Sequence, residues 1–168
     1  PEKKTEELCV EAFRMLALEN KLKVDGVQEL KRYIHSCYYG HFADHFGDQF
    51  APLIALQAAA NVTSDLRLGT LVLDNDYRHP LVLAKELATL DVLSNGRVEA
   101  GVGAGWMTTD YETAGIPLDP HGRRIERLAE ALTVIKALFA DGPVDHEGEH
   151  YRVTGLEGTP KPVQRPHP

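Results

Sequence analysis

The sequence from Asn95 to Trp106 reads Asn-Gly-Arg-Val-Glu-Ala-Gly-Val-Gly-Ala-Gly-Trp, and it decides which fold we expect. Asn95-Gly96 predicts a turn, because both residues tolerate a positive φ. The segment that follows, Arg97 to Val102, alternates in character and predicts a short strand. Where this strand ends, glycine stands at every second position, namely at Gly101, Gly103 and Gly105.

The missing side chains of these three glycines predict one bare wall, against which a flat ligand can lie. Gly103, at the centre, is expected to approach the ligand most closely. In parallel α/β proteins ligands bind at the carboxyl ends of strands, and this is such an end. A glycine-rich turn that only allows close packing remains the alternative. The spacing does not match the Gly-x-Gly-x-x-Gly fingerprint of a nicotinamide dinucleotide site, and the bulky Trp106 follows it.

The segments on both sides predict alternating helices and strands. Upstream we expect a helix from Ala51 to Asn61, a nearly continuous buried strand from Leu66 to Leu73, and a helix from His79-Pro80 to Asn95-Gly96. Downstream we expect a helix from Arg123 to Ala140, a hairpin from Val144 to Val153, and an extended segment from Thr159 to Val163. Short connections indicate parallel strands with crossover helices, which is an α/β fold.

The first 40 residues do not fit this alternation. Periodic apolar residues predict one helix from Thr5 to Leu18 and a second from Val27 to Ser36. The segment from Cys37 to Phe50 mixes aromatic residues, histidines and aspartates, which favours a loop that faces a ligand. Cys37, His41 and His45 are spaced by four residues, as helical zinc ligands can be. Glycines within the segment argue against a continuous helix, and we expect no metal.

Composition is that of an ordinary globular protein and argues against two classes of partner. The 168 residues are 43% hydrophobic and 26% charged, which suits one domain with a sizeable core. The formal net charge is -7 without a run of lysine or arginine, so neither nucleic acid nor an anionic membrane is the expected partner. With 2 cysteines and no apolar run long enough to span a membrane, the cytoplasm is the expected location.

Several motifs occur together and in order. They are Ala43-Asp44-His45-Phe46, Leu68-Gly69-Thr70-Leu71-Val72, Asn95-Gly96-Arg97-Val98, Gly101 to Trp106, Gly122-Arg123-Arg124, Glu126-Arg127-Leu128, Tyr151-Arg152 and Pro160-Lys161-Pro162-Val163-Gln164. In combination they resemble the luciferase-like monooxygenase superfamily, on its branch of deazaflavin (coenzyme F-420) dependent oxidoreductases. The resemblance covers about residues 43–168. It implies a (β/α)8 barrel that binds FMN or coenzyme F-420 at the carboxyl ends of its strands.

Such a barrel takes about 250 residues, so the resemblance implies only part of one. We expect two parts: residues 1–40, a helical segment of unclear origin, and residues 41–168, the N-terminal half of a luciferase-like (β/α)8 barrel. A natural fragment, a truncated gene and an engineered fusion all remain open. A half-barrel would expose apolar strand edges, which predicts a homo-oligomer.

The resemblance implies catalytic roles for Asp44 and His45. They match an aspartate and a histidine that face the cofactor ring in deazaflavin-dependent sugar-phosphate dehydrogenases. An imidazole, whose unperturbed pKa is about 6.5, can take a proton from an alcohol while hydride leaves the carbon, and the neighbouring carboxylate would orient it. Those dehydrogenases also have a tryptophan and a general-acid glutamate where this chain has Gln49 and Trp106. Glucose 6-phosphate is therefore not the expected substrate.

The resemblance further implies a cofactor site at two neighbouring strand ends. We assign to it Thr70, Leu71, Val72, Gly101, Gly103, Gly105 and Trp106. A non-proline cis peptide is common under the flavin ring in this family, which predicts a cis bond between Leu71 and Val72. Plain strand core is the alternative for Thr70, Leu71 and Val72.

Two groups of charged or titratable residues are interpreted as surface features. For Arg123, Arg124 and Arg127 we favour a solvated helix face with ion pairs three or four residues apart over a phosphate site. His146 and His150 flank the hairpin turn and are interpreted as exposed.

Two functions remain open from the sequence. The first is a flavin- or deazaflavin-dependent oxidoreductase or monooxygenase that transfers hydride to or from a small organic substrate, with coenzyme F-420 or FMN. The second is a catalytically inactive fragment with a role in folding or assembly only.

Overall fold

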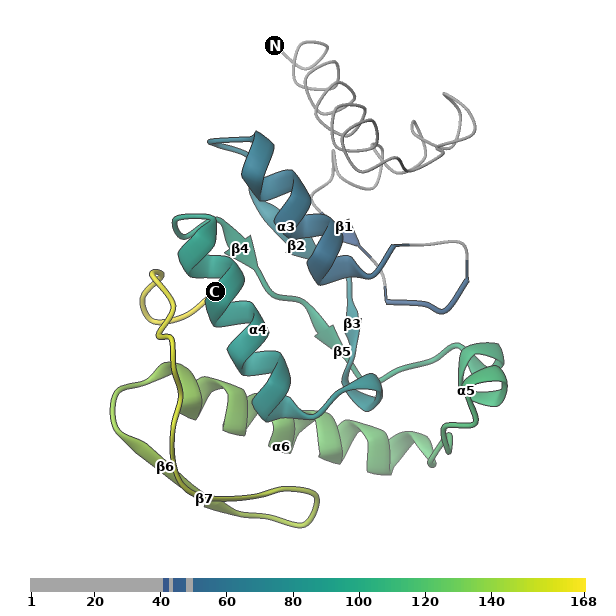
Figure 1. The fold of residues 1–168 in the computed structure, drawn as a ribbon. Coiled ribbons are helices and arrows are strands. Elements are labelled where there is room, and N and C mark those ends of the chain that lie inside the picture. The colour runs from purple at the N-terminus through teal and green to yellow at the C-terminus, as the bar shows by residue number, and fades with distance from the viewer. Residues whose placement is uncertain (1–40, 43, 48–49) are drawn as a thin grey trace, which may run out of the picture.

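The computed structural model describes residues 41–42, 44–47 and 50–168 (Figure 1). The helices expected between Thr5 and Ser36 lie outside these residues, as does Cys37. The described elements are β1 (His41–Phe42), α3 (Pro52–Val62), β2 (Leu68–Thr70), β3 (Leu73–Asp74), the 3-10 turn η1 (Asn75–Tyr77), α4 (Pro80–Leu93), β4 (Val98–Glu99), β5 (Val102–Gly103), α5 (Thr108–Ala114), α6 (His121–Phe139), β6 (Pro143–Glu147) and β7 (Arg152–Glu157). The alternation of helices and strands confirms the expected α/β class.

Parallel strands connect the first half of the described chain. β1, β2 and β4 form one parallel sheet in that order, and β3 and β5 form a second parallel pair. Figure 1 shows β3 continuing from β2 and β5 continuing from β4 toward the same end of the molecule. The residues that follow β3 and β5 therefore meet at one edge.

The expected continuous strand from Leu66 to Leu73 is wrong, because it begins at Leu68 and is interrupted at Leu71-Val72. At the interruption the side chain of Thr70 replaces the backbone ladder. Its Oγ1 donates to the carbonyl oxygen of Gly101 at 2.8 Å and accepts from the Gly101 N–H at 2.9 Å. The backbone ladder resumes at Leu73, whose N–H donates to the same carbonyl. The peptide bond between Leu71 and Val72 is cis, as predicted.

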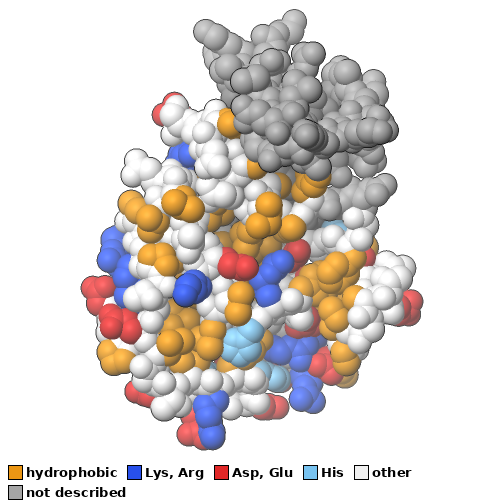
Figure 2. All heavy atoms as spheres, viewed as in Figure 1, with side chains coloured by type: hydrophobic (Ala, Val, Ile, Leu, Met, Phe, Trp, Pro, Cys, Tyr) orange, Lys and Arg blue, Asp and Glu red, His pale blue; other side chains and the backbone are white. Residues whose placement is uncertain are grey.

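The core lies between the parallel strands and three helices, α3, α4 and α6 (Figure 1). Buried apolar side chains from each layer meet there, including Leu56, Leu68, Leu87, Val98 and Val134. Each such side chain contributes about 1.5–3 kcal/mol when it is removed from water. Charged and apolar atoms alternate on the face shown in Figure 2, where orange apolar patches remain accessible.

The helix boundaries follow local signals. α3 and α4 begin at Pro52 and Pro80, in the first turn where a missing N–H costs nothing. The side chain of His79 caps α4 by accepting a hydrogen bond from the Leu81 N–H at 3.2 Å. Asn95 and Gly96 end this segment at φ values of 57° and 76°, which confirms the expected turn.

Differences from the expected elements concern the second half. α6 begins at His121, two residues before the expected Arg123, directly after Pro120 at its N-cap. The hairpin is confirmed as antiparallel β6 and β7, although β7 continues to Glu157. The segment from Thr159 to Val163, expected to be extended, bends at Thr159-Pro160 and again at Val163. α5 was not expected at all. None of the helices in the described residues is both long and apolar enough to cross a membrane.

Candidate functional site

A cavity of about 130 Å³ lies where β3 and β5 end. Its walls are formed by Asp44, His45, Leu71, Val72, Asp74, Gly105 and Trp106. All of these except Asp74 were assigned to the site from the sequence. The other assigned residues, Thr70, Gly101 and Gly103, do not line the cavity and instead join the two strands behind it.

Asp44 ties the segment after β1 to the neighbouring strand end. Its N–H donates to the carbonyl oxygen of Val72 at 3.3 Å, and its Oδ2 accepts from the Asp74 N–H at 3.2 Å. The same oxygen lies 2.5 Å from Nη1 of Arg78. The carboxylate is buried. Because a buried carboxylate needs such partners, Asp44 fixes this wall of the cavity.

His45 is paired with a carboxylate from a distant element. Its Nδ1 lies 2.7 Å from Oδ2 of Asp110, in the first turn of α5, and both side chains are largely buried. The hydroxyl of Tyr77 lies 3.4 Å from the same oxygen. The expectation that Asp44 orients His45 is therefore wrong, because Asp44 is engaged by Arg78.

Two apolar side chains form the accessible rim of the cavity. Leu71 and Trp106 both line it and both remain exposed to solvent. The ring of Trp106 meets the ring of His45 edge to face, with centroids 5.8 Å apart and planes at 90°. An imidazole with a carboxylate partner thus lies beside an accessible indole.

The expected bare glycine wall is wrong in its geometry. A Cβ built on Gly101 would overlap the carbonyl oxygen of Thr70, and one on Gly103 would lie 2.6 Å from Cγ2 of Val72. Gly105 has a φ of 74°, and a Cβ there would overlap the Tyr111 hydroxyl. The chain's own atoms fill these three spaces, so the glycines allow the strand ends to pack closely. Only Gly105 lines the cavity.

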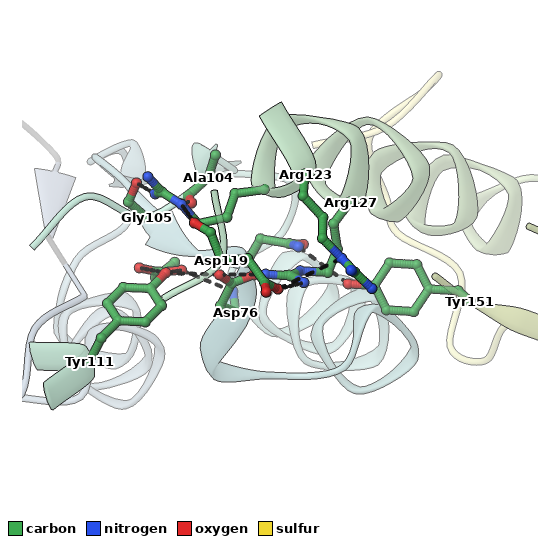
Figure 3. A network of polar contacts seen from close by, with 11 residues as sticks. Asp76, Ala104, Gly105, Tyr111, Asp119, Arg123, Arg127 and Tyr151 are labelled. Carbon is green, nitrogen blue, oxygen red and sulfur yellow. Dashed lines mark hydrogen bonds and ion pairs between the residues drawn. The ribbon is translucent and has the colours of Figure 1, made fainter. Parts of the chain in front are cut away.

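A polar network lies behind the cavity (Figure 3). The Tyr111 hydroxyl lies 3.0 Å from both carboxylate oxygens of Asp74 and 3.0 Å from Oδ2 of Asp76. Arg127 forms a two-point ion pair with Asp76, at 2.8 and 2.9 Å, and reaches Asp119 at 2.6 Å. Burial, the largest cause, raises the pKa of Tyr111 well above its ordinary value. Tyr111 is consequently a neutral hydrogen-bond donor.

The solvated-face interpretation of the α6 arginines holds only for Arg123, whose Nε lies 4.0 Å from Asp119. Arg124 is buried at 8% exposure, and its Nη1 donates to the carbonyl oxygens of Ala104, at 3.0 Å, and Gly105. Its Nε donates to the Asp119 carbonyl at 2.9 Å. Arg124 thus fastens the start of α6 to the turn that carries Trp106.

The interpretation of the hairpin histidines as exposed is also wrong. Nε2 of His146 lies 3.0 Å from Oε1 of Glu130 on α6, and both side chains are largely buried. The backbone N–H groups of His150 and Tyr151 donate to Glu130 at 2.9 and 2.8 Å. Burial raises the pKa of Glu130, but these hydrogen bonds outweigh it and lower the value to about 2.

Residues that the sequence did not reveal complete the site: Asp74, Asp110, Tyr111 and Arg124. Asp110 and Tyr111 lie on α5, and the sequence signal for this helix was Gly115, which ends it at a φ of 68°. Within the described residues, no three His, Cys, Asp or Glu side chains are grouped as metal ligands.

The chain is similar to known proteins over most of its length. The family model described as luciferase-like monooxygenase matches residues 35–168. The chain is 32% identical over 136 residues to the oxygenase component of the flavin-dependent trigonelline monooxygenase from Acinetobacter baylyi, covering 80% of this chain and 37% of that protein. Other relatives are named as FMNH2-dependent or F-420-dependent enzymes.

Solved structures show the same fold. The monooxygenase RslO1 from Streptomyces bottropensis aligns with a TM-score of 0.69 at 30% identity, over 76% of this chain and 40% of that one. The coenzyme F-420 dependent tetrahydromethanopterin reductase from Methanopyrus kandleri aligns with a TM-score of 0.66 at 27% identity, over 74% and 38%. The chain spans less than half the length of these relatives. The chain belongs to the luciferase-like monooxygenase family.

Proposed function

We propose that this chain carries the catalytic pocket of a flavin- or deazaflavin-dependent oxidoreductase of the luciferase-like type. The reaction is hydride transfer to or from a small organic substrate, and the cavity beside Leu71-Val72 is its site. The observation that carries the proposal is the His45–Asp110 pair, 2.7 Å apart, in a cavity with an accessible apolar rim.

The residues around the cavity fit a flat heteroaromatic ring. Leu71, Val72 and Trp106 offer apolar surface, whereas Asp44, His45 and Asp74 offer polar groups on the same cavity. Apolar walls with a few placed polar groups are typical of cofactor sites. Bound FMN or coenzyme F-420 supplies the hydride donor or acceptor there. Gly105 lines the cavity and would contact the ring through its backbone, whereas Thr70, Gly101 and Gly103 support the wall.

His45 is proposed to move the proton that accompanies the hydride. Asp110 holds its Nδ1, which leaves Nε2 to take a proton from an alcohol oxygen or to return one to a carbonyl oxygen. The Asp110 carboxylate then stabilises the imidazolium that forms. Asp44 does not take part in this step in our proposal, because it positions the loop before His45.

We further propose that the described strands are part of a (β/α)8 barrel and that residues 41–168 make its N-terminal half. The parallel order of β1, β2 and β4 supports this arrangement. Exposed apolar side chains, such as Ile54 and Val82, support the expected homo-oligomer. The cytoplasm as its location and a small molecule as its substrate are further parts of the proposal.

The test is an equilibrium titration of FMN and coenzyme F-420 with the chain, followed by the anisotropy of cofactor fluorescence. We expect a dissociation constant in the micromolar range, about -8 kcal/mol. Leu71→Asp places a charge on the rim and should weaken binding at least about tenfold. The matched control is Leu93→Asp, because Leu71 and Leu93 are 61% and 62% exposed and only Leu71 lines the cavity. No binding at about 1 mM contradicts the proposal and supports the inactive fragment.

A further inference from the structure

Four aspartates either line the cavity or contact a residue that does, and one of them differs from the others in its partners. Asp44 is paired with Arg78, Asp76 with Arg127 and Asp110 with His45. Asp74 accepts only from neutral donors, the Asp76 N–H at 2.9 Å and the Tyr111 hydroxyl at 3.0 Å. In the part of the chain that the structure describes, no cation contacts it.

The Tyr111 hydroxyl lies between Asp74 and Asp76 and cannot donate a hydrogen bond to both carboxylates. Tyr111 carries one proton, yet three carboxylate oxygens lie 3.0 Å from its Oη. Asp76 is neutralised by the two-point ion pair with Arg127. Asp74 is 7% exposed, and an unpaired charge at such a site is costly. A proton on Asp74 removes this cost and the repulsion between the two carboxylates.

The charged groups that face Asp74 come from three elements. They are Asp44 and His45 from the segment after β1, Asp76 and Tyr77 from η1, and Tyr111 from α5. Burial raises the pKa of Asp74, the hydrogen bonds from Asp76 and Tyr111 lower it, and the charges of Asp76 and Asp44 raise it again, with an upward net shift.

Asp74 is also placed to reach a bound molecule. It ends β3 and lines the cavity, on the side where Gly105 has no Cβ. A Cβ on Gly105 would lie 2.6 Å from Oδ2 of Asp74, so the glycine leaves room for this oxygen.

We propose that Asp74 is a neutral carboxylic acid in the folded protein and donates a hydrogen bond to the molecule bound in the cavity. The proposal rests on the proposed function for the identity of the site. The group it takes is an acceptor oxygen or ring nitrogen that is neutral or gains negative charge. The carboxylic acid that donates is thus Asp74, at the end of β3. The position after Gly105 cannot supply one, because Trp106 stands there.

The protonation of Asp74 is tested without any ligand, by the free energy of unfolding of wild type and Asp74→Asn against pH. In the unfolded chain the aspartate ionises near its ordinary pKa of 3.8, whereas in the folded protein it retains its proton. The folded state therefore binds more protons, and wild-type stability falls relative to Asp74→Asn as the pH rises above about 4. A stability difference that stays constant from about pH 4 to pH 8 overturns the proposal.

Asp76→Asn is the matched control, two residues away and against the same hydroxyl. It removes the two-point partner of Arg127, which keeps only Asp119, so at neutral pH it should unfold at a lower temperature than Asp74→Asn. Equal losses for the two variants would mean that Asp74 is an ionised partner like Asp76, which also overturns the proposal.

The donor role is tested by titrating FMN and coenzyme F-420 into wild type, Asp74→Asn and Asp74→Ala across pH. Asparagine can still accept from Tyr111 and donate through Nδ2, so we expect Asp74→Asn to bind within about threefold of wild type. Asp74→Ala should bind at least about tenfold more weakly. Wild-type affinity should fall where Asp74 ionises, and that of Asp74→Asn should not.

Alanine binding as tightly as aspartate overturns the donor role. If wild type binds neither cofactor, the proposed function and the donor role are overturned together. The pH dependence of unfolding in wild type and Asp74→Asn still decides whether Asp74 is protonated.

Discussion

Nδ1 of His45 lies 2.7 Å from Oδ2 of Asp110, although 65 residues separate them in the sequence. The pair forms because α5 follows the Gly105-Trp106 turn. The first helical turn of α5, which carries Asp110, contacts the segment after β1. A carboxylate in this position holds the imidazole ring in a fixed orientation.

The first prediction uses Trp106, the only tryptophan in the chain, as a reporter of His45. Asp110 holds the imidazole, and the imidazole lies 5.8 Å from the indole, so the His45–Asp110 pair sets the surroundings of Trp106. Asp110→Ala releases the imidazole and should therefore shift the wavelength and the intensity of Trp106 emission. Asp110→Asn keeps a hydrogen-bonding oxygen and should shift the emission less.

Exposed Glu112→Ala, on the same helix, is the control and should leave the emission unchanged. An emission spectrum of Asp110→Ala that matches wild type would contradict the role of Asp110 in holding His45.

The second prediction concerns Arg124 and its neighbour Arg123. Arg124→Gln leaves three part-buried carbonyl oxygens without their charged donor and should cost about 1–3 kcal/mol of unfolding free energy. It should also shift the emission of Trp106, whose turn it releases. Arg123→Gln, with 58% of its side chain exposed in wild type, should cost less than about 1 kcal/mol. Equal losses of unfolding free energy in the two variants would contradict the role of Arg124 in fastening α6 to this turn.

A third prediction compares glycines whose missing side chain allows close packing with a glycine that faces open space. Gly105→Ala combines a positive φ with overlap of the Tyr111 hydroxyl and should lose at least about 2 kcal/mol. Gly103→Val should lose stability and also weaken cofactor binding, because it displaces Val72 in the cavity wall.

The control for this series is Gly122→Ala in α6, where a Cβ meets open space. It should be neutral or stabilise by up to about 1 kcal/mol, since alanine favours helix. Thermal and urea unfolding measure the series. Comparable losses at Gly105 and Gly122 would refute the close-packing account.

The fourth prediction concerns acid stability. Because the pKa of Glu130 is lowered from 4.5 to about 2, its contribution to stability is present above pH 4.5 and is lost as the pH falls toward 2. The unfolding free energy of Glu130→Gln should therefore depend less on pH in this window than that of wild type. Exposed Glu112→Gln on α5 is the control and should follow wild type. A Glu130→Gln curve parallel to wild type would remove the assigned role.

Local signals predicted much of the fold. The prolines at Pro52 and Pro80 and the Asn95-Gly96 turn predicted where helices begin and end, because their φ preferences act within a few residues. The break after Thr70 was not predicted, because a side chain replaces a backbone partner only once Gly101 lies beside it.

The sequence predicted most of the residues that line the cavity, but it did not predict which charged side chains pair with one another. Family motifs identified His45 and Trp106, both of which line the cavity. The carboxylate beside His45 is far away in sequence, on a helix without a strong periodic signal, so Asp44 was assigned instead. Arg124 was misplaced for a similar reason, because its carbonyl acceptors belong to another segment.

The most direct test of the central claim is a two-dimensional nitrogen–proton NMR titration with FMN or coenzyme F-420. The single tryptophan yields a single side-chain indole N–H signal, and Trp106 lines the cavity. The account predicts that this signal shifts and saturates with a micromolar dissociation constant, about -8 kcal/mol, and that Leu71→Asp weakens the response about tenfold. An indole signal that does not move at about 1 mM of either cofactor would contradict the account.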